Sequence, residues 1–77
     1  MDGYENLANA IILQAVKDYK AALRKLRYLP KDKDALKSKR EIERFFRSAW
    51  FADLTEADGE IILQSIRLQF KRKKEAV

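Results

Sequence analysis

Residues 43–60 read ERFFRSAWFADLTEADGE, and this stretch decides the fold. Four of the chain's eight aromatic residues lie within seven of its positions: Phe45, Phe46, Trp50 and Phe51. A protein of 77 residues can bury only a small core. A cluster of this size therefore forms either the centre of that core or the anchor of an interface.

A helix that continues to about residue 52 places these aromatic side chains on different faces. Its predicted buried face contains five apolar residues: Leu36, Ile42, Phe45, Phe46 and Ala49. Trp50 and Phe51 follow at the helix end and cannot both face the core, because consecutive helical residues point ~100° apart. We expect one of the two to be a partly exposed anchor. The alternative is that Trp50 covers the core beneath the turn at residues 52–55.

A third helix is predicted directly after the aromatic residues. Thr55 and Asp58 resemble a capping box, with Asp in the place usually taken by Glu. The carboxylates of Glu56, Asp58 and Glu60 would then lie in or near the first turn, where the helix dipole favours negative charge. Together with Asp53 they match no calcium-binding loop, so the sequence predicts a helix start here and no metal site.

The other end of this third helix is basic. The helix is predicted to end near Lys73, so that residues 71–77 form a frayed basic tail. Gly59 costs a helix ~1 kcal/mol relative to alanine, which indicates that it permits a close contact. We expect that contact to be with Trp50 or with the first helix.

The first helix is predicted over residues 5–29. Its apolar residues recur at alternating spacings of four and three, which is typical of a heptad seam: Ala8, Ile12, Ala15, Tyr19, Ala22, Leu26 and Leu29. Pro30 ends it, and Asp32 is the predicted N-cap of the second helix. Such a helix spans nearly 40 Å at ~1.5 Å per residue, so part of it should project or meet a partner. Residues 1–77 are thus predicted to form a single all-α domain of three helices, a long first helix and then a helical hairpin, in a small bundle.

The residue types exclude several classes of function. The chain has no cysteine and no histidine, so disulfides, Cys/His zinc sites and histidine catalysis are impossible. No other nucleophile and base stand at a recognisable spacing, and we predict a protein that is not an enzyme and takes no metal, cofactor or small-molecule substrate. Residues 1–5 lack the basic region of a signal peptide, and no apolar run approaches the ~18 residues of a membrane span. A cytoplasmic protein without a membrane partner is expected.

Two segments of the chain resemble each other. Residues 11–17 read IILQAVK, and residues 61–67 read IILQSIR. Three consecutive large apolar residues cover most of a helix's circumference, so both segments should be buried on more than one side. This pattern favours a homodimer. Its interface is predicted at Ile12, Leu13, Ile62 and Leu63, and at whichever of Trp50 and Phe51 is exposed. The alternative is chance similarity between two amphipathic helices.

Basic residues form two stripes along the predicted helices. The net charge is +5, and residues 17–47 are strongly basic. Each stripe follows the spacing i, i+3, i+7, i+10, which places its members on one helix face: Lys17, Lys20, Arg24 and Arg27 in the first helix, and Lys37, Arg40, Arg44 and Arg47 in the second. Such stripes could bind phosphates without reading sequence. The alternative is a solvated face whose charge is partly paired with Asp18, Glu41 and Glu43.

This chain resembles a group of small proteins that are encoded by phages, prophages and other mobile elements of Gram-positive bacteria. The resemblance covers most of residues 4–68 and is carried by residues 10–19 (AIILQAVKDY) and by the pattern Glu43-x-Phe45-Phe46-x-Ser48-x-Trp50-Phe51-x-x-Leu54-Thr55-x-x-Asp58-Gly59-Glu60. That family is functionally uncharacterised, so no site residue is carried over from it. The resemblance implies an accessory protein of a mobile element that acts in the cytoplasm of the host cell.

Two functions follow as expectations. The first is a non-enzymatic protein that binds nucleic acid, or a nucleic-acid-handling complex, through its basic helical faces. The second is an anti-defence inhibitor, such as an anti-CRISPR, that binds a host protein through apolar and aromatic surface. The basic net charge argues against an inhibitor that mimics DNA with acidic residues.

Overall fold

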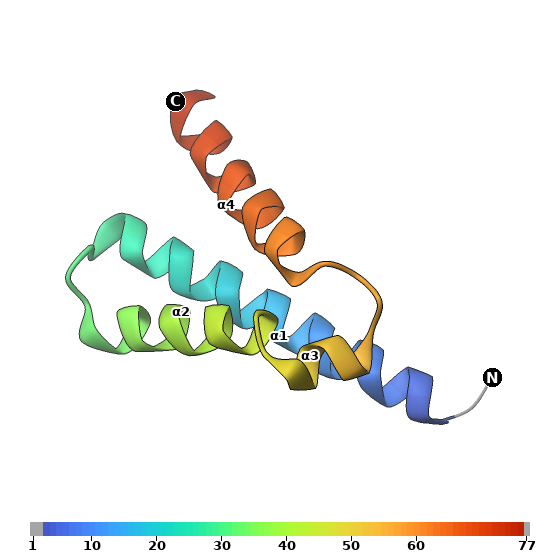
Figure 1. The fold of residues 1–77 in the computed structure, drawn as a ribbon. Coiled ribbons are helices and arrows are strands. Elements are labelled where there is room, and N and C mark those ends of the chain that lie inside the picture. The colour runs from blue at the N-terminus through green and yellow to red at the C-terminus, as the bar shows by residue number, and fades with distance from the viewer. Residues whose placement is uncertain (1–2, 77) are drawn as a thin grey trace.

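A computed structural model describes residues 3–76, and every element in that range is a helix (Figure 1). The elements are α1 (Gly3–Tyr28), α2 (Lys33–Phe46), α3 (Ala49–Leu54) and α4 (Gly59–Ala76). The predicted all-α class is confirmed, but the described chain has four helices where three were expected. None of these helices is long and apolar enough to cross a membrane.

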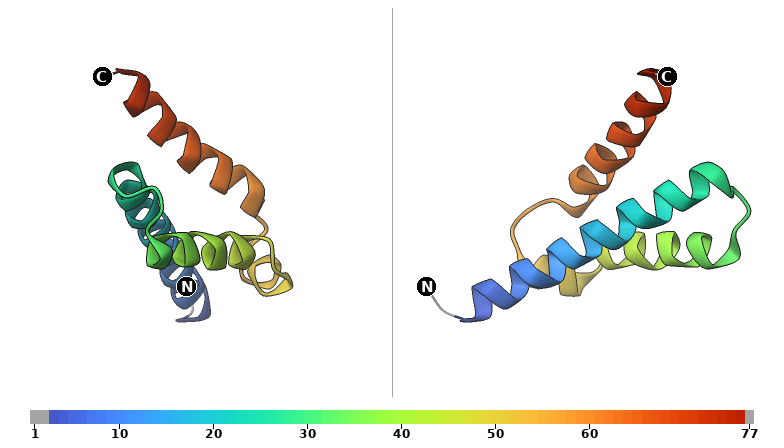
Figure 2. Two further views of the ribbon diagram at one scale, coloured as in Figure 1. Left: turned by 90° about the vertical axis from the view of Figure 1, so that its left-hand side faces the viewer. Right: turned by 180° about the vertical axis from the view of Figure 1, so that it is seen from behind.

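α1 and α2 form an antiparallel hairpin, and α4 crosses it (Figures 1 and 2). Only residues 29–32 connect α1 to α2, and so short a connection keeps successive helices side by side. The Asp32 carboxylate accepts the Ala35 N–H at 2.8 Å, which confirms Asp32 as the N-cap of α2. The hairpin was expected between the second and third helices, and this detail of the prediction is wrong. α3 and a further turn separate α2 from α4, which leaves α4 free to cross at an angle.

Ser48 divides the predicted second helix into α2 and α3. Its Oγ donates to the Phe45 carbonyl at 2.6 Å and accepts the Phe51 N–H at 3.1 Å, so one hydroxyl ends α2 and caps α3. In an unbroken helix Phe46 and Phe51 would point about 140° apart. The break turns both rings inward, and each is only 2% exposed. Ala49, which was predicted to be buried, is exposed for the same reason.

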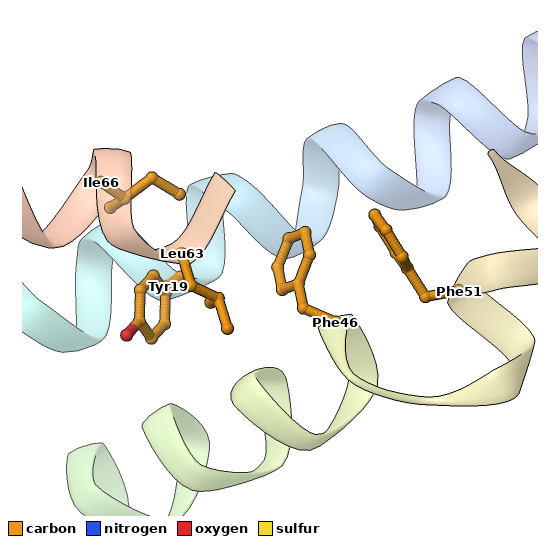
Figure 3. Close-up of a cluster of buried hydrophobic side chains, with 5 residues drawn as sticks. All are labelled: Tyr19, Phe46, Phe51, Leu63 and Ile66. Carbon is orange, nitrogen blue, oxygen red and sulfur yellow. The ribbon is translucent and has the colours of Figure 1, made fainter. Parts of the chain in front are cut away.

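The core lies where α4 meets the hairpin and α3. Its buried members are Tyr19 of α1, Phe46 of α2, Phe51 of α3, and Leu63 and Ile66 of α4 (Figure 3). Tyr19 and Leu63 are fully buried. Every helix thus contributes to one cluster, so α4 is held by packing rather than by a short connection.

α4 begins at Gly59, and not at the predicted Thr55. Asp58 caps it, because its Oδ1 accepts the Glu60 N–H at 2.9 Å and its carbonyl accepts the Ile62 N–H at 3.2 Å. Thr55 instead follows α3, and its Oγ1 accepts the Ala57 N–H at 3.2 Å. This local turn competes with a helical start, as threonine and aspartate side chains commonly do.

Gly59 is buried against the end of α2, and not against Trp50 or α1 as expected. A Cβ at this position would overlap the carbonyl oxygen of Phe46 and lie 2.9 Å from its carbonyl carbon. The first turn of α4 therefore rests directly on the α2 backbone.

The two longest helices end close to their predicted limits. α1 starts two residues before its predicted beginning and ends one residue early, and its seam is buried at Ala8, Tyr19 and Ala22. α4 continues to Ala76, past the predicted end at Lys73. The frayed tail at residues 71–77 stays a prediction, and Val77 lies outside the described residues.

Candidate functional site

The two basic stripes lie on opposite sides of the α1–α2 hairpin. Ala22 and Ala35 are buried between the two helices. At ~100° per residue, Arg24 is about 200° around α1 from Ala22, and Arg44 is about 180° around α2 from Ala35. Both arginines are exposed. The stripes therefore face away from each other and do not form one continuous surface.

The α1 stripe instead lies beside the C-terminal half of α4. Arg27, its last member, donates through Nη2 to the Phe70 carbonyl at 2.8 Å, and its guanidinium carbon lies 5.6 Å from the centre of the Phe70 ring. Lys71 of α4 is exposed one residue after Phe70, whereas Arg67 lies 3.6 Å from both Glu43 and Glu60. We call the α1 stripe (Lys17, Lys20, Arg24 and Arg27) together with Lys71 the basic surface.

The α2 stripe is partly neutralised within the chain. Arg47 makes a bidentate contact with Glu60 of α4, at 2.8 Å from Nε to Oε1 and 3.2 Å from Nη2 to Oε2. The Glu60 carboxylate raises the pKa of Arg47, and the Arg47 guanidinium lowers the pKa of Glu60. Arg47 thus binds α4, while Lys37, Arg40 and Arg44 stay exposed.

A polar network at the centre of the molecule was missed by the sequence reasoning. The Tyr19 hydroxyl donates to Oε2 of Glu43 at 2.7 Å, and the same oxygen lies 2.9 Å from Lys39 and 3.6 Å from Arg67. Burial, with the adjacent Glu43 carboxylate, raises the pKa of Tyr19 above its ordinary value. Burial opposes ionisation of Glu43, but hydrogen bonds from Tyr19 and Lys39 outweigh it and lower the pKa of Glu43. The available signal was a tyrosine in an apolar seam, whose hydroxyl needs a partner when buried.

The predicted interface residues differ in exposure. Trp50 is 58% exposed and its ring stands edge-on to Phe45, at 5.3 Å between centroids, so it is the exposed one of the Trp50–Phe51 pair. Phe51 and Leu63 are buried in the core, and their assignment to an interface is wrong. Ile12 and Ile62 are half-buried and Leu13 is exposed. Of the predicted interface residues, these three and Trp50 are accessible to a second chain. Five further large apolar side chains are exposed among the described residues: Leu7, Tyr28, Leu29, Ile61 and Leu68.

A groove with apolar and acidic lining runs between α1 and α2. It consists of two hollows, of about 380 and 420 Å³, that share Asp18, Glu41 and Ile42. One hollow extends to Trp50 and is lined by Ile11, Gln14, Ala15 and Phe45. The other extends to Lys25 and Asp34 and is lined by Ala21, Ala22, Ala35 and Ser38. We call this feature the α1–α2 groove. No residue of α4 lines it.

Comparison of the chain with protein-family models, with curated proteins and with solved structures gave no match. Among residues 3–76, no group of three acidic side chains is placed to hold a metal ion. The basic surface and the α1–α2 groove are two candidate sites.

Proposed function

We propose that this protein binds nucleic acid through the basic surface. The observation that carries the proposal is the contact between Arg27 and the Phe70 carbonyl at 2.8 Å, which joins the end of the α1 stripe to α4 beside the exposed Lys71. Phosphates attract clustered lysine and arginine side chains on one face. The α2 stripe faces the other way and has lost Arg47 to Glu60.

The expected binding is electrostatic and largely independent of sequence. Lys17 and Arg24 are exposed and lie seven residues, or about two helical turns, apart on the same face of α1. Both can therefore approach one nucleic-acid backbone. Neutralising Z phosphates of duplex DNA releases counterions and gives log K a slope of about −0.9Z against log salt. With about four to five contacts we expect a slope near −4.

The test uses two matched charge reversals. Lys17→Glu with Arg24→Glu alters the α1 stripe, and Lys37→Glu with Arg44→Glu alters the α2 stripe. Each pair joins a lysine to an arginine seven residues later on an exposed helix face, and each lowers the net charge by the same amount. A difference between the pairs therefore reports position and not total charge.

The measurement is fluorescence anisotropy with a labelled 30-base-pair duplex and a labelled 20-nucleotide single-stranded RNA at low salt. We expect the α1 pair to weaken binding at least about 10-fold and the α2 pair to weaken it much less. Circular dichroism confirms that both variants stay helical. An equal loss in both variants, or no binding by the wild-type protein at low salt, would reject the proposal.

A second candidate function is inhibition of a host defence protein, and the 58% exposure of Trp50 favours it. An exposed tryptophan fixed against Phe45 is a suitable interface anchor. If this function holds, one dominant host protein should be recovered with the wild-type chain and lost with Trp50→Ala. Under either function, we propose an accessory protein of a phage or other mobile element that acts in the host cytoplasm without catalysis.

A further inference from the structure

We infer that the α1–α2 groove binds one amphipathic helix of a partner protein, a helix whose apolar stripe is flanked by lysine or arginine. This interaction is separate from the proposed binding of nucleic acid, because the groove and the basic surface share no residue. The argument rests on the shape of the groove, the position of Trp50 and the charges along the groove.

The shape of the groove suits a helix. It follows α1 from Ile11 to Lys25, which is about 21 Å at ~1.5 Å per residue, or roughly four helical turns. Small side chains line each of its two hollows and allow a close approach: Ala15 in one, and Ala21, Ala35 and Ser38 in the other. A peptide that binds by β-strand addition would need a free strand edge, and the elements of residues 3–76 are all helices.

One end of the groove provides an apolar anchor. Trp50 is 58% exposed, and its ring is held edge-on to Phe45 at 5.3 Å between centroids. Ile42 and Ile11 continue this apolar lining along the two helices. A leucine or phenylalanine from a docked helix would bury the exposed tryptophan face, as happens at interface hot spots.

The charges in the groove select a basic partner. Asp18 and Glu41 line both hollows, from α1 and α2 respectively, and Asp34 lines the far end. Gln14 holds Asp18 in place by donating to its Oδ1 at 3.0 Å. Lys25 is the one cation among the lining residues, and it lies 3.8 Å from Asp32. These carboxylates repel phosphate, so the groove suits a basic helix and does not suit nucleic acid.

The proposal is tested with two defined peptides. Each has 16 residues, with leucine at helical spacing; one has lysine and the other glutamate at the flanking positions. The full ¹⁵N-labelled protein is titrated with each peptide and observed by NMR. We expect the lysine peptide to bind more tightly and to shift the signals of Ala15, Ile42 and the Trp50 indole. The net charge of +5 would by itself favour the glutamate peptide, so this preference reports the groove.

Two sets of variants sharpen the test. Trp50→Ala should weaken binding of the lysine peptide at least about 10-fold. Leu68→Ala is the matched control, because Leu68 is 54% exposed but lies on α4, and it should leave binding unchanged. Asp18→Lys with Glu41→Lys should reverse the preference in favour of the glutamate peptide.

Three outcomes would overturn the proposal. The lysine peptide could bind no better than the glutamate peptide. Its shifts could map to α4 instead of the groove. Sedimentation could also show a dimer that Trp50→Ala dissociates, which would make a second copy of this chain the occupant.

Discussion

The hydroxyl of Tyr19 donates a 2.7 Å hydrogen bond to Oε2 of Glu43 and so joins α1 to α2 at the centre of the molecule. The same carboxylate lies 3.6 Å from Arg67 of α4. One acidic side chain therefore contacts both other long helices, at the place where α4 crosses the hairpin. Tyr19 is fully buried, so its hydroxyl depends on this partner for a hydrogen bond.

The Tyr19–Glu43 contact should give a measurable coupling energy in a double-mutant cycle. Tyr19→Phe is expected to lower the free energy of unfolding by about 1–2 kcal/mol, since a hydrogen bond to a charged group is lost. Glu43→Gln should also destabilise, and the double variant should cost less than the two single changes together. Urea unfolding followed by circular dichroism measures all four proteins. Tyr28→Phe, at a site 75% exposed, is the control with little effect, and strict additivity would show that the contact contributes nothing.

The free energy of unfolding should decrease at acidic pH because Glu43 becomes protonated. Its pKa is lower in the folded chain than the ~4.3 of an unfolded glutamate, because hydrogen bonds from Tyr19 and Lys39 outweigh the effect of burial. Its contribution is therefore present above pH ~4.3 and is lost as the pH falls through the folded pKa. Urea unfolding between pH 6 and 3 should show a shallower decline for Glu43→Gln than for the wild type. Equal slopes would contradict this assignment.

Stability should also fall on the alkaline side because of Tyr19. Burial, with the hydrogen bond and charge of Glu43, raises its pKa above the ordinary value of 10.0. The folded chain keeps the proton longer, so this contribution is complete below pH ~10 and is lost as the pH rises toward the folded pKa. Tyr19→Phe should lose less stability than the wild type between pH 9 and 11. Tyr28→Phe should behave as the wild type does, and a similar flattening in that variant would remove Tyr19 as the cause.

Gly59→Ala should destabilise the fold although alanine is the better helix former. The new Cβ would overlap the Phe46 carbonyl oxygen, and a backbone group cannot rotate away as a side chain can. Overpacking of this kind costs up to about 3 kcal/mol, and overlap with a backbone atom should place this site near that upper end, above the ~1 kcal/mol gained in helix propensity. Thermal unfolding of Gly59→Ala is compared with that of Ser65→Ala, an exposed α4 position where no loss is expected. An unchanged melting temperature for Gly59→Ala would show that α4 can move off the end of α2.

Alanine substitutions at Leu63 and Leu68 should lower the free energy of unfolding by different amounts, because Leu63 is in the core and Leu68 is on the surface of α4. Leu63 is fully buried, and its truncation to alanine is expected to cost about 2–5 kcal/mol. Leu68 is 54% exposed, and the same truncation there should cost less than about 0.5 kcal/mol. Urea unfolding of the two variants gives the comparison. Similar losses that also depend on protein concentration would mean that Leu68 is covered by a second chain.

Local signals in the sequence predicted part of this fold correctly. The heptad spacing and Pro30 place α1 within two residues of its observed limits, and Asp32 caps α2. The helix-end argument predicted that one of Trp50 and Phe51 is exposed, and this residue is Trp50. These features depend on side-chain spacing and on capping within a few residues, which a linear pattern records.

The candidate sites were less predictable. Both basic stripes were identified, yet the spacing along each helix contains no information on how the two helices face each other. Only the packing of Ala22 against α2 shows that Arg24 and Arg44 point in opposite directions. The α1–α2 groove was missed for the same reason, since its two walls are nine residues apart in the chain at their nearest, at Lys25 and Asp34, and farther apart elsewhere.

The sequence by itself determined that this chain is helical, where α1 ends and α2 begins, and that its charge is basic. These properties follow from propensity, capping and composition, which act within a turn or two of helix. The tertiary structure alone decided that Phe51 and Leu63 are core, how the two basic stripes face, and that the end of the α1 stripe contacts α4. The physical reason is that Phe46, Phe51 and Leu63 come from three different helices, and the burial of each depends on its contacts with the others in one cluster.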